Sequence, residues 1–257
     1  MKIGIIGLGA IGRYVRQQIL TEGHEVGAVL VRPQRMASRE PGWIESADDL
    51  PGDIHHIVDC AGHQALKQHG PKILERGIEL ITVSIGALAD SEVMQRLQQA
   101  AEKGGARLHL ASGAIGALDC LQAARVGRLA SVTYIGRKPP AGWKGSPAQE
   151  RLDLDELDQA AVHFEGSARV AAMDYPKNAN VAAAVALAGL GFDETRVQLI
   201  ADPGISENIH EVHAEGDFGR FDFEIRGRSL PDNPRSSALA AMSVISRLQQ
   251  SIQSVGF

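Results

Sequence analysis

Three glycines near the start of the chain, Gly7, Gly9 and Gly12, have the spacing of the GxGxxG dinucleotide-binding fingerprint. A short apolar run precedes them and a helical pattern follows, which is the context that the fingerprint requires. Gly7 would allow the tight turn, Gly9 the approach of a pyrophosphate, and Gly12 close packing of helix and strand. The phosphates would face N–H groups at the helix N-terminus, near Ala10 and Ile11. The motif therefore predicts an NAD or NADP site.

The position that separates NAD from NADP carries an arginine. An Asp or Glu about 20 residues after the last glycine would bind the ribose 2′-hydroxyl of NAD. Counting from Gly12 leads instead to Arg32, with Arg35 shortly after it. An arginine can bind a 2′-phosphate through charge-assisted hydrogen bonds. Arg32 therefore favours acceptance of NADP, and a solvated side chain that still tolerates NAD is the alternative.

Two further glycine-containing turns follow apolar runs, at 59–63 (DCAGH) and 84–87 (SIGA). In a doubly wound sheet they would lie at the carboxyl ends of strands, where the cofactor binds. Ala61 and Gly62 are therefore predicted cofactor contacts. His63 has either a ribose or substrate contact or a structural role.

The two cysteines, Cys60 and Cys120, cannot form a disulfide framework and match no zinc spacing. We expect both to be small buried apolar residues, and we expect no metal site. Such cysteine usage is typical of a reducing cytoplasm.

Histidines are the natural proton carriers for dehydrogenase chemistry, because their charge changes near neutral pH. Of the nine histidines, His55, His56 and His109 lie in strand-like runs and are expected to be structural. His210 and His213 lie close together before a strand-like segment further along the chain. Spacing alone does not choose between these two.

The elements that must position these residues follow two different secondary-structure patterns. Up to about residue 111, apolar strand-like runs alternate with helical patterns, which predicts right-handed βαβ units and a parallel sheet. The runs are at 2–6, 25–31, 53–60, 79–83 and 107–111, and the helical patterns are at 11–20, 64–76 and 91–103.

After about residue 115 the pattern changes to that of an α+β domain. Expected strands lie at 131–137 and 211–228, and expected helices at 153–162, 167–173 and 180–190. An apolar stripe predicts a last helix over 236–252, with Ser236 or Ser237 as its N-cap. The predicted fold class is α/β, with an N-terminal Rossmann doubly wound parallel sheet and a second α+β substrate and dimerisation domain. The first domain would cover 1–110, completed by a helix within 234–257, and the second 111–233.

Composition excludes several classes of protein. With 44% apolar and 22% charged residues, the 257-residue chain is neither disordered nor a coiled coil. A net charge of -5 argues against a general nucleic-acid binder. The weakly polar stretch 181–192 is shorter than the ~20 residues of a membrane span, and no targeting segment is visible. We therefore expect a cytoplasmic protein without membrane or nucleic-acid partners.

An ordered set of segments gives a more specific indication, because on these segments the chain resembles the L-aspartate dehydrogenase family over nearly its whole length. Besides GLGAIG at 7–12 they are SGAIGALD at 112–119, RKPP at 137–140, FEGSAR at 164–169, PKNANVAA at 176–183, ADP at 201–203, NIHE at 208–211 and NPRSS at 233–237.

The resemblance implies reversible oxidative deamination, in which L-aspartate, NAD(P)+ and water give oxaloacetate, ammonia and NAD(P)H by way of iminoaspartate. It connects the chain to NAD biosynthesis or aspartate metabolism and implies a homodimer, with the last helix packed on the cofactor domain. Position by position, the catalytic histidine falls on His210 and two cofactor contacts fall on Ala114 and Asn180. His213 matches no role. A base must lie within ~3 Å of the reacting amine, directly or through one water, and His210 is the expected base.

A substrate with two carboxylates also needs cationic or N–H donors. The expected contacts are Arg137, Lys138 and Lys177, with backbone groups of Ser112 and Gly113. Two alternatives remain at this point: a dihydrodipicolinate-reductase-like NAD(P)H reductase of a dicarboxylate, and a non-catalytic NADP-sensing regulator. Formation of NAD(P)H from L-aspartate would separate the dehydrogenase from both.

Overall fold

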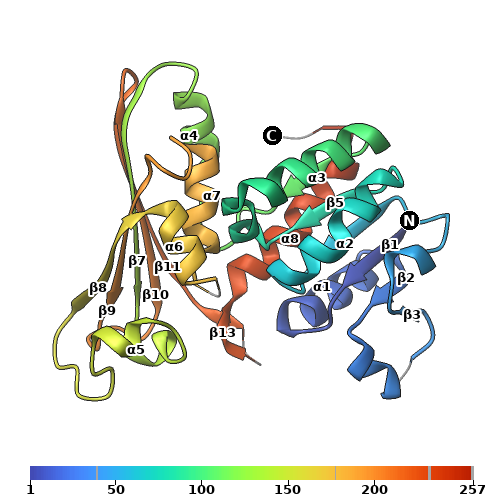
Figure 1. The fold of residues 1–257 in the computed structure, drawn as a ribbon, viewed down its shortest axis with the longest axis horizontal. Helices are drawn as coiled ribbons and strands as arrows, with labels where there is room; N and C mark the ends of the chain where they lie inside the picture. The colour runs from blue at the N-terminus through green and yellow to red at the C-terminus, as the bar shows by residue number, and fades with distance from the viewer. Residues whose placement is uncertain (39, 177, 231–232, 256–257) are drawn as a thin grey trace. The chain divides into compact units, whose positions relative to one another are not determined.

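The fold is drawn in Figure 1 from a computed structural model, which describes residues 1–38, 40–176, 178–230 and 233–255. The chain divides into two units, Met1–Gly113 with Ala240–Phe257, and Ala114–Leu239. The sequence pattern places these borders near 110 and 234. Each unit is built around a β-sheet of its own.

The first unit contains a six-stranded sheet in the order β3-β2-β1-β4-β5-β6, and all of its pairings are parallel. This is the strand order of the Rossmann fold, so the expected doubly wound sheet is confirmed. The edge strand β3 was not expected, because it is only two residues long. The strands are β1 (Lys2–Ile6), β2 (Glu25–Leu30), β3 (Trp43–Ile44), β4 (His56–Asp59), β5 (Glu79–Thr82) and β6 (Leu108–Leu110).

Helices flank this sheet and bury apolar stripes against it. They are α1 (Ala10–Thr21), α2 (His63–Glu75), α3 (Ser91–Gly104) and the last helix, α8 (Ala238–Ile252), with short 3-10 turns η1 (Pro33–Ser38), η2 (Ala47–Asp49) and η3 (Ile85–Ala89). Helix α3 shows how the sequence sets the ends: Asp90 accepts hydrogen bonds from the N–H groups of Glu92 and Val93, and Gly105 ends the helix in the left-handed conformation.

Helix α8 completes the core of the first unit. Val244 and Leu248 are fully buried in one cluster with Ile3 and Ile81 of the sheet. The helix begins at Ala238, directly after Ser237, one of the two expected N-cap residues. Ser236 and Ser237 themselves end β13 (Asn233–Ser237), which pairs with β12 (Ser229–Leu230).

The second unit contains a mixed sheet in the order β11-β10-β7-β9-β8. Only β7 and β9 pair in parallel, and the other pairings are antiparallel. The expected second α+β domain is therefore confirmed. The strands are β7 (Leu129–Lys138), β8 (Ala161–Ser167), β9 (Arg196–Ala201), β10 (Asn208–Gly216) and β11 (Gly219–Gly227).

The helices of this unit lie on one face of its sheet (Figure 1). They are α4 (Leu118–Ala124), α5 (Ala148–Arg151), α6 (Ala168–Asp174) and α7 (Asn180–Ala188), with the 3-10 turn η4 (Pro140–Trp143). Helix α7 is buried along almost its whole length, which suits its small alanine side chains. The opposite face carries partly exposed residues such as Ile135 and Glu211, and no helix covers it among the residues that the structure describes.

Two expectations about this unit are wrong. The expected acidic helix at 153–162 is an irregular loop that leads into β8. Its first residue, Asp153, accepts hydrogen bonds from the N–H groups of Asp155 and Glu156, a turn that competes with helix formation. The expected strand at 211–228 is a hairpin of two strands, with a two-residue turn between Gly216 and Gly219.

No helix in the described part of the chain is long and apolar enough to span a membrane.

Candidate active site

At each position of the GxGxxG motif a glycine is required for a different physical reason. Gly7 has a φ of +85°, and a side chain there would lie 2.8 Å from the Cβ of Ala61. At Gly12 a Cβ would lie 2.1 Å from the carbonyl oxygen of Gly7, so α1 can approach β1 only without a side chain. A Cβ added at Gly9 would meet no atom within 4 Å among the described residues beyond its chain neighbours, so the open space there is available to a ligand. These are the three roles that a dinucleotide-binding turn requires.

This turn forms one wall of a pocket of about 600 Å³. Gly7, Gly9 and Ala61 line it, with Arg32 and Arg35 from the segment after β2. Helix α1 begins at Ala10 with Gly9 in the N-cap position, and no side chain among the described residues caps it. The N–H groups at Ala10 and Ile11 are therefore suited to bind phosphate.

The wall of the pocket formed by the segment after β2 contains both positively and negatively charged side chains. Arg32 and Arg35 are exposed, and Nη1 of Arg35 lies 3.5 Å from the carbonyl oxygen of Leu8. Glu45, which follows β3, also lines the pocket. Counting along the chain could not indicate Glu45, because the two-residue strand β3 brings it beside β2.

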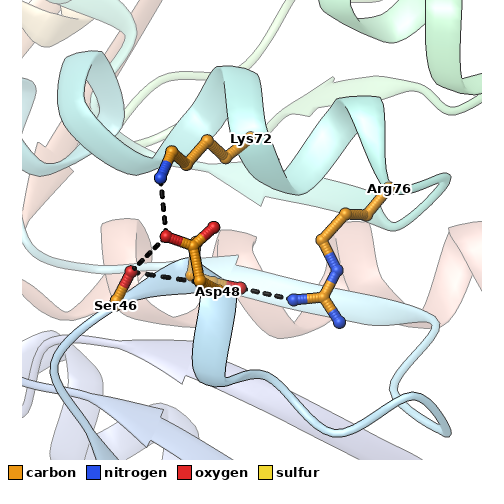
Figure 2. Close-up of polar contacts among 5 residues, drawn as sticks. Ser46, Asp48, Lys72 and Arg76 are labelled. Carbon is orange, nitrogen blue, oxygen red and sulfur yellow. Dashed lines mark hydrogen bonds and ion pairs between the residues drawn. The ribbon is translucent and has the colours of Figure 1, made fainter.

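A polar cluster at Asp48 holds the loop that carries this wall (Figure 2). Nζ of Lys72, on α2, lies 2.6 Å from Oδ2 of Asp48, and Oγ of Ser46 lies 3.0 Å from the same oxygen. Arg76 donates hydrogen bonds to the carbonyl oxygens of Ala47 and Leu50. Hydrogen bonds from Lys72 and then Ser46 lower the pKa of Asp48. Helix α2 thereby fixes Ser46, a lining residue of the pocket.

A buried carboxylate organises the turn that contains Ala61 and Gly62. Asp59 is fully buried and accepts hydrogen bonds from the N–H of Ala61 (2.9 Å) and the hydroxyls of Thr82 and Ser84 (2.7 Å each). Burial raises the pKa of Asp59, although all three donors favour its charged form. Gly62 has a φ of +91° and stands in the N-cap position of α2. Asp59 was not predicted as a functional residue from the sequence. An acidic residue between apolar residues at the end of a strand is the pattern that could have indicated it.

The two cysteines differ from each other. Cys60 is partly buried, and burial followed by the charge of Asp59 raises the pKa of its thiol well above its usual range. Cys120 is exposed on α4. The expectation that both are buried is therefore wrong for Cys120.

The residues at 112–114 follow β6 and span the border between the units. Gly113 has a φ of +73°, and its N–H donates a hydrogen bond to Oγ of Ser243 on α8 (3.1 Å). Ser112 is partly buried, and Ala114 is buried.

The second unit contains a polar group in its core, built on the helix-covered face of β7 and β10. His210, on β10, is 3% exposed and Tyr134, on β7, is 1% exposed. The hydroxyl of Tyr134 lies 2.7 Å from Nδ1 of His210, and the two rings are stacked with centroids 6.0 Å apart. Burial and then the charge of Lys138 lower the pKa of His210 to about 3, so the ring is neutral at neutral pH. Burial raises the pKa of Tyr134.

Lys138 lies four residues after Tyr134 on the same strand and therefore on the same face. Its Nζ donates a hydrogen bond to Oδ1 of Asn178 (3.0 Å) and lies 5.1 Å from the ring centroid of Trp143. Burial lowers the pKa of Lys138 to about 8. Sequence analysis named His210 and Lys138 but missed Tyr134 and Asn178.

Two other residues named from the sequence, Arg137 and His213, lie on the opposite face of this sheet. Arg137 faces the opposite side of the sheet, and its Nη1 lies 2.9 Å from Oδ2 of Asp202. His213 is also on that side, with Nδ1 2.6 Å from Oδ1 of Asp222. Asn180 is partly buried at the start of α7. Lys177 lies outside the described residues.

No group of three or more His, Cys, Asp or Glu side chains in the described ranges is placed to hold a metal ion.

Comparison with known proteins assigns both halves of the chain. The family model described as homoserine dehydrogenase, NAD binding domain, matches residues 7–111. The model described as aspartate dehydrogenase, C-terminal, matches residues 119–251. The first match agrees with a pyridine-nucleotide cofactor.

Individual relatives agree with these matches. The L-aspartate dehydrogenase of Ruegeria pomeroyi is 52% identical over 254 residues, which cover 97% of this chain and 92% of that protein. The crystal structure of aspartate dehydrogenase from Thermotoga maritima has a TM-score of 0.79 at 28% identity, and covers 100% of this chain and 99% of that chain.

Dihydrodipicolinate reductase from Paenisporosarcina sp. TG-14 has a TM-score of 0.55 at 14% identity, and covers 97% of this chain and 94% of that chain, which shows a likeness of fold alone. The full-length identity to the first relative and the match over residues 119–251 decide between the two groups. This chain belongs to the L-aspartate dehydrogenase family.

Proposed function

We propose that the chain is an NAD(P)-dependent L-aspartate dehydrogenase, which converts L-aspartate, NAD(P)+ and water to oxaloacetate, ammonia and NAD(P)H by way of iminoaspartate. The observation that carries the proposal is the buried pair of His210 and Tyr134, beside the partly buried Lys138, in the unit that matches the family's own C-terminal model. A non-catalytic regulator would have no need for two buried titratable groups on one face of a sheet.

The pyridine nucleotide would be held by the pocket of the first unit, whose open space at Gly9, uncapped α1 and exposed Arg32 fit a dinucleotide. We propose as its contacts the residues that the sequence indicated: Gly7, Gly9, Ala10, Ile11, Gly12, Arg32, Ala61 and Gly62, with Ala114 and Asn180 from the second unit. When bound, the nicotinamide supplies the hydride acceptor for the substrate Cα–H.

Deamination also needs a group that takes a proton from the substrate ammonium. A ring with a pKa of about 3, such as that of His210, is a weak proton acceptor at neutral pH. The amine of Lys138, with a pKa of about 8, is better matched. We therefore assign the proton to Nζ of Lys138: the substrate N–H bond breaks, the electron pair stays on the substrate nitrogen, and Lys138 becomes an ammonium. His210 remains a proposed catalytic residue, which contacts the groups bonded to the substrate carbon that loses the hydride.

The substrate carboxylates need further donors. Of the residues named from the sequence, the backbone N–H of Ser112 and the side chain of Lys177 remain proposals for this role. Gly113 and Arg137 are weaker proposals, since the N–H of Gly113 already donates to Oγ of Ser243 and the guanidinium of Arg137 already contacts Asp202 on the other face of the sheet. After it takes the proton, Lys138 can also attract a carboxylate.

The direct test is a screen of L-amino acids with NAD+ and NADP+, followed by the absorbance of the reduced nicotinamide. We expect a response to L-aspartate and an absolute requirement for ammonia when oxaloacetate is reduced. Reduction of a dicarboxylate without ammonia would support the reductase instead. Cofactor binding with no turnover of any amino acid would support the regulator.

Arg32 is proposed to favour NADP. We expect Arg32→Asp to lower the preference for NADP over NAD, measured as the ratio of kcat/KM values, by roughly 10–100-fold, because hydrogen bonds to charged groups contribute about 1.5–3 kcal/mol. Arg96→Asp, an exposed charge reversal on α3 outside the pocket, is the matched control. An unchanged ratio in Arg32→Asp would remove Arg32 from cofactor selection.

We also propose a cytoplasmic homodimer that serves NAD biosynthesis or aspartate metabolism. The uncovered face of the second sheet supports dimerisation, because it leaves partly exposed residues such as Ile135 available to a second copy. Light scattering on the purified protein tests the oligomeric state.

A further inference from the structure

The hydroxyl of Tyr134 has one hydrogen-bond partner among the residues that the structure describes, Nδ1 of His210. Tyr134 is 1% exposed, so a phenol proton that did not point at Nδ1 would be buried without an acceptor. Burial also raises the pKa of Tyr134, so the phenol keeps its proton. The hydroxyl of Tyr134 therefore donates, and Nδ1 of His210 accepts.

This direction fixes the tautomer of the ring. A neutral imidazole carries one proton, so a ring that accepts at Nδ1 carries its proton at Nε2. Burial keeps His210 neutral, with a pKa of about 3. At neutral pH the Nε2 atom of His210 consequently carries the proton and can act as a hydrogen-bond donor.

The strand opposite His210 is shaped for this contact. Gly136 pairs directly with His210 across β7 and β10. A Cβ at Gly136 would lie 2.7 Å from the hydroxyl of Tyr134, and 3.2 Å from its Cζ. Only a glycine leaves the tyrosine hydroxyl the space from which it reaches Nδ1.

We propose that Tyr134, with the space left by Gly136, is a positioning residue that holds His210 as a hydrogen-bond donor through Nε2 toward the oxygen on the reacting carbon. That oxygen is the carbonyl of the keto acid, or the water-derived oxygen that precedes it. A neutral imidazole donor of this kind polarises a carbonyl without releasing its proton. The role toward substrate rests on the proposed function, whereas the tautomer does not.

The tautomer can be measured without any substrate. In protein labelled with nitrogen-15 at histidine, the shifts of the two ring nitrogens separate a protonated nitrogen from an unprotonated one, and the spectrum of His210→Asn identifies the resonances of His210. We expect an unprotonated Nδ1 in the wild type and a mixture of tautomers in Tyr134→Phe. A protonated Nδ1 in the wild type overturns the proposal.

Activity provides the second readout. We expect Tyr134→Phe to lower kcat roughly tenfold, which corresponds to one hydrogen bond, with little change in cofactor affinity. Gly136→Ala should shift the tautomer in the same direction, because it displaces the hydroxyl while both partners remain. The matched control is Tyr175→Phe, which removes a buried hydroxyl 3.1 Å from Nδ1 of His163 in the same unit and should leave the tautomer of His210 unchanged.

The outcomes separate this proposal from the proposed function. If the protein shows the expected tautomer but does not oxidise L-aspartate, the proposed substrate is wrong and the positioning role of Tyr134 is retained. If Tyr134→Phe keeps normal turnover of L-aspartate and an unchanged tautomer of His210, the positioning role of Tyr134 is wrong and the proposed dehydrogenase activity is retained.

Discussion

His210→Asn should lower kcat for L-aspartate oxidation by ~10²–10³, the range for loss of one hydrogen-bond donor that stabilises charge on the reacting oxygen. The affinity for the dinucleotide should change little, because the glycine turn and Arg32 belong to the other unit. His210→Gln should lose less activity than His210→Asn. The glutamine amide nitrogen can take the place of Nε2 as a donor, whereas the asparagine amide nitrogen falls near Nδ1.

Steady-state kinetics and fluorescence titration with the reduced cofactor measure these effects. The control is His213→Asn, which makes the same change three residues along β10 but on the opposite face, where His213 contacts Asp222. We expect its turnover to stay within about twofold of the wild type, since surface substitutions change stability by about 0.5 kcal/mol or less. Near-normal turnover in His210→Asn would contradict the role assigned to His210. Equal losses in His210→Gln and His210→Asn would show that an N–H donor alone is not what the site needs.

The pair of His210 and His213 also shows what sequence reasoning can reach. Spacing did not choose between them, because strand residues three positions apart point to opposite faces and the buried face is not written in the pattern around them. Register decides: His210 pairs with Gly136 and faces Tyr134, whereas His213 pairs with Thr133 on the uncovered side. The family resemblance selected the same residue without this geometry.

Contiguous signals predicted more than dispersed ones. The glycine turn, its strand and its helix lie within residues 2–21, and the local sterics of such a turn recur in Rossmann folds, so the first sheet could be predicted. Tyr134 and His210 are 76 residues apart and meet only because β7 and β10 are neighbours. Asp59 likewise depends on Thr82, the last residue of β5, and on Ser84, which follows that strand. Such partners cannot be inferred without the strand order.

Arg137 and Lys138 illustrate the same limit at single-residue scale. As neighbours in one cationic segment they were indistinguishable in the sequence. In β7 they point to opposite faces, so the partly buried Lys138 contacts Asn178 and the buried Trp143, while Arg137 contacts Asp202. A one-residue shift of register would exchange their environments.

Lys138→Ala should lower kcat/KM for L-aspartate by ~10²–10⁴ at neutral pH, because it removes the proposed proton acceptor. The sign of the pH dependence distinguishes the two roles open to this lysine. As an acceptor, Lys138 must be neutral, so in the wild type kcat/KM rises with pH and levels off above a pKa of about 8. As a cation that only holds a carboxylate, Lys138 must be charged, and kcat/KM would fall above the same pH.

The titration can be assigned because, in the described part of the chain, the titratable groups that face Lys138 do not change charge in this range. His210 on β10 and His163 on β8 have pKa values lowered to about 3 and about 4, mainly by burial, and burial raises that of Tyr134 on β7. The ammonium of the substrate also titrates, but its limb remains in every variant. The limb lost in Lys138→Ala therefore belongs to Lys138.

Chemical rescue tests directly whether the missing amine of Lys138 is the proton acceptor. Added ethylamine should restore part of the kcat/KM of Lys138→Ala, with a dependence on the concentration of the neutral amine, because a small amine can enter the space of the lost side chain and take the proton. Lys144→Ala, a change at an exposed lysine that contacts Asp155, should need no rescue and keep the wild-type profile. A falling limb in the wild type, or rescue that follows the protonated amine instead, would reassign Lys138 to the substrate carboxylate and leave the proton acceptor to be sought elsewhere in the second unit.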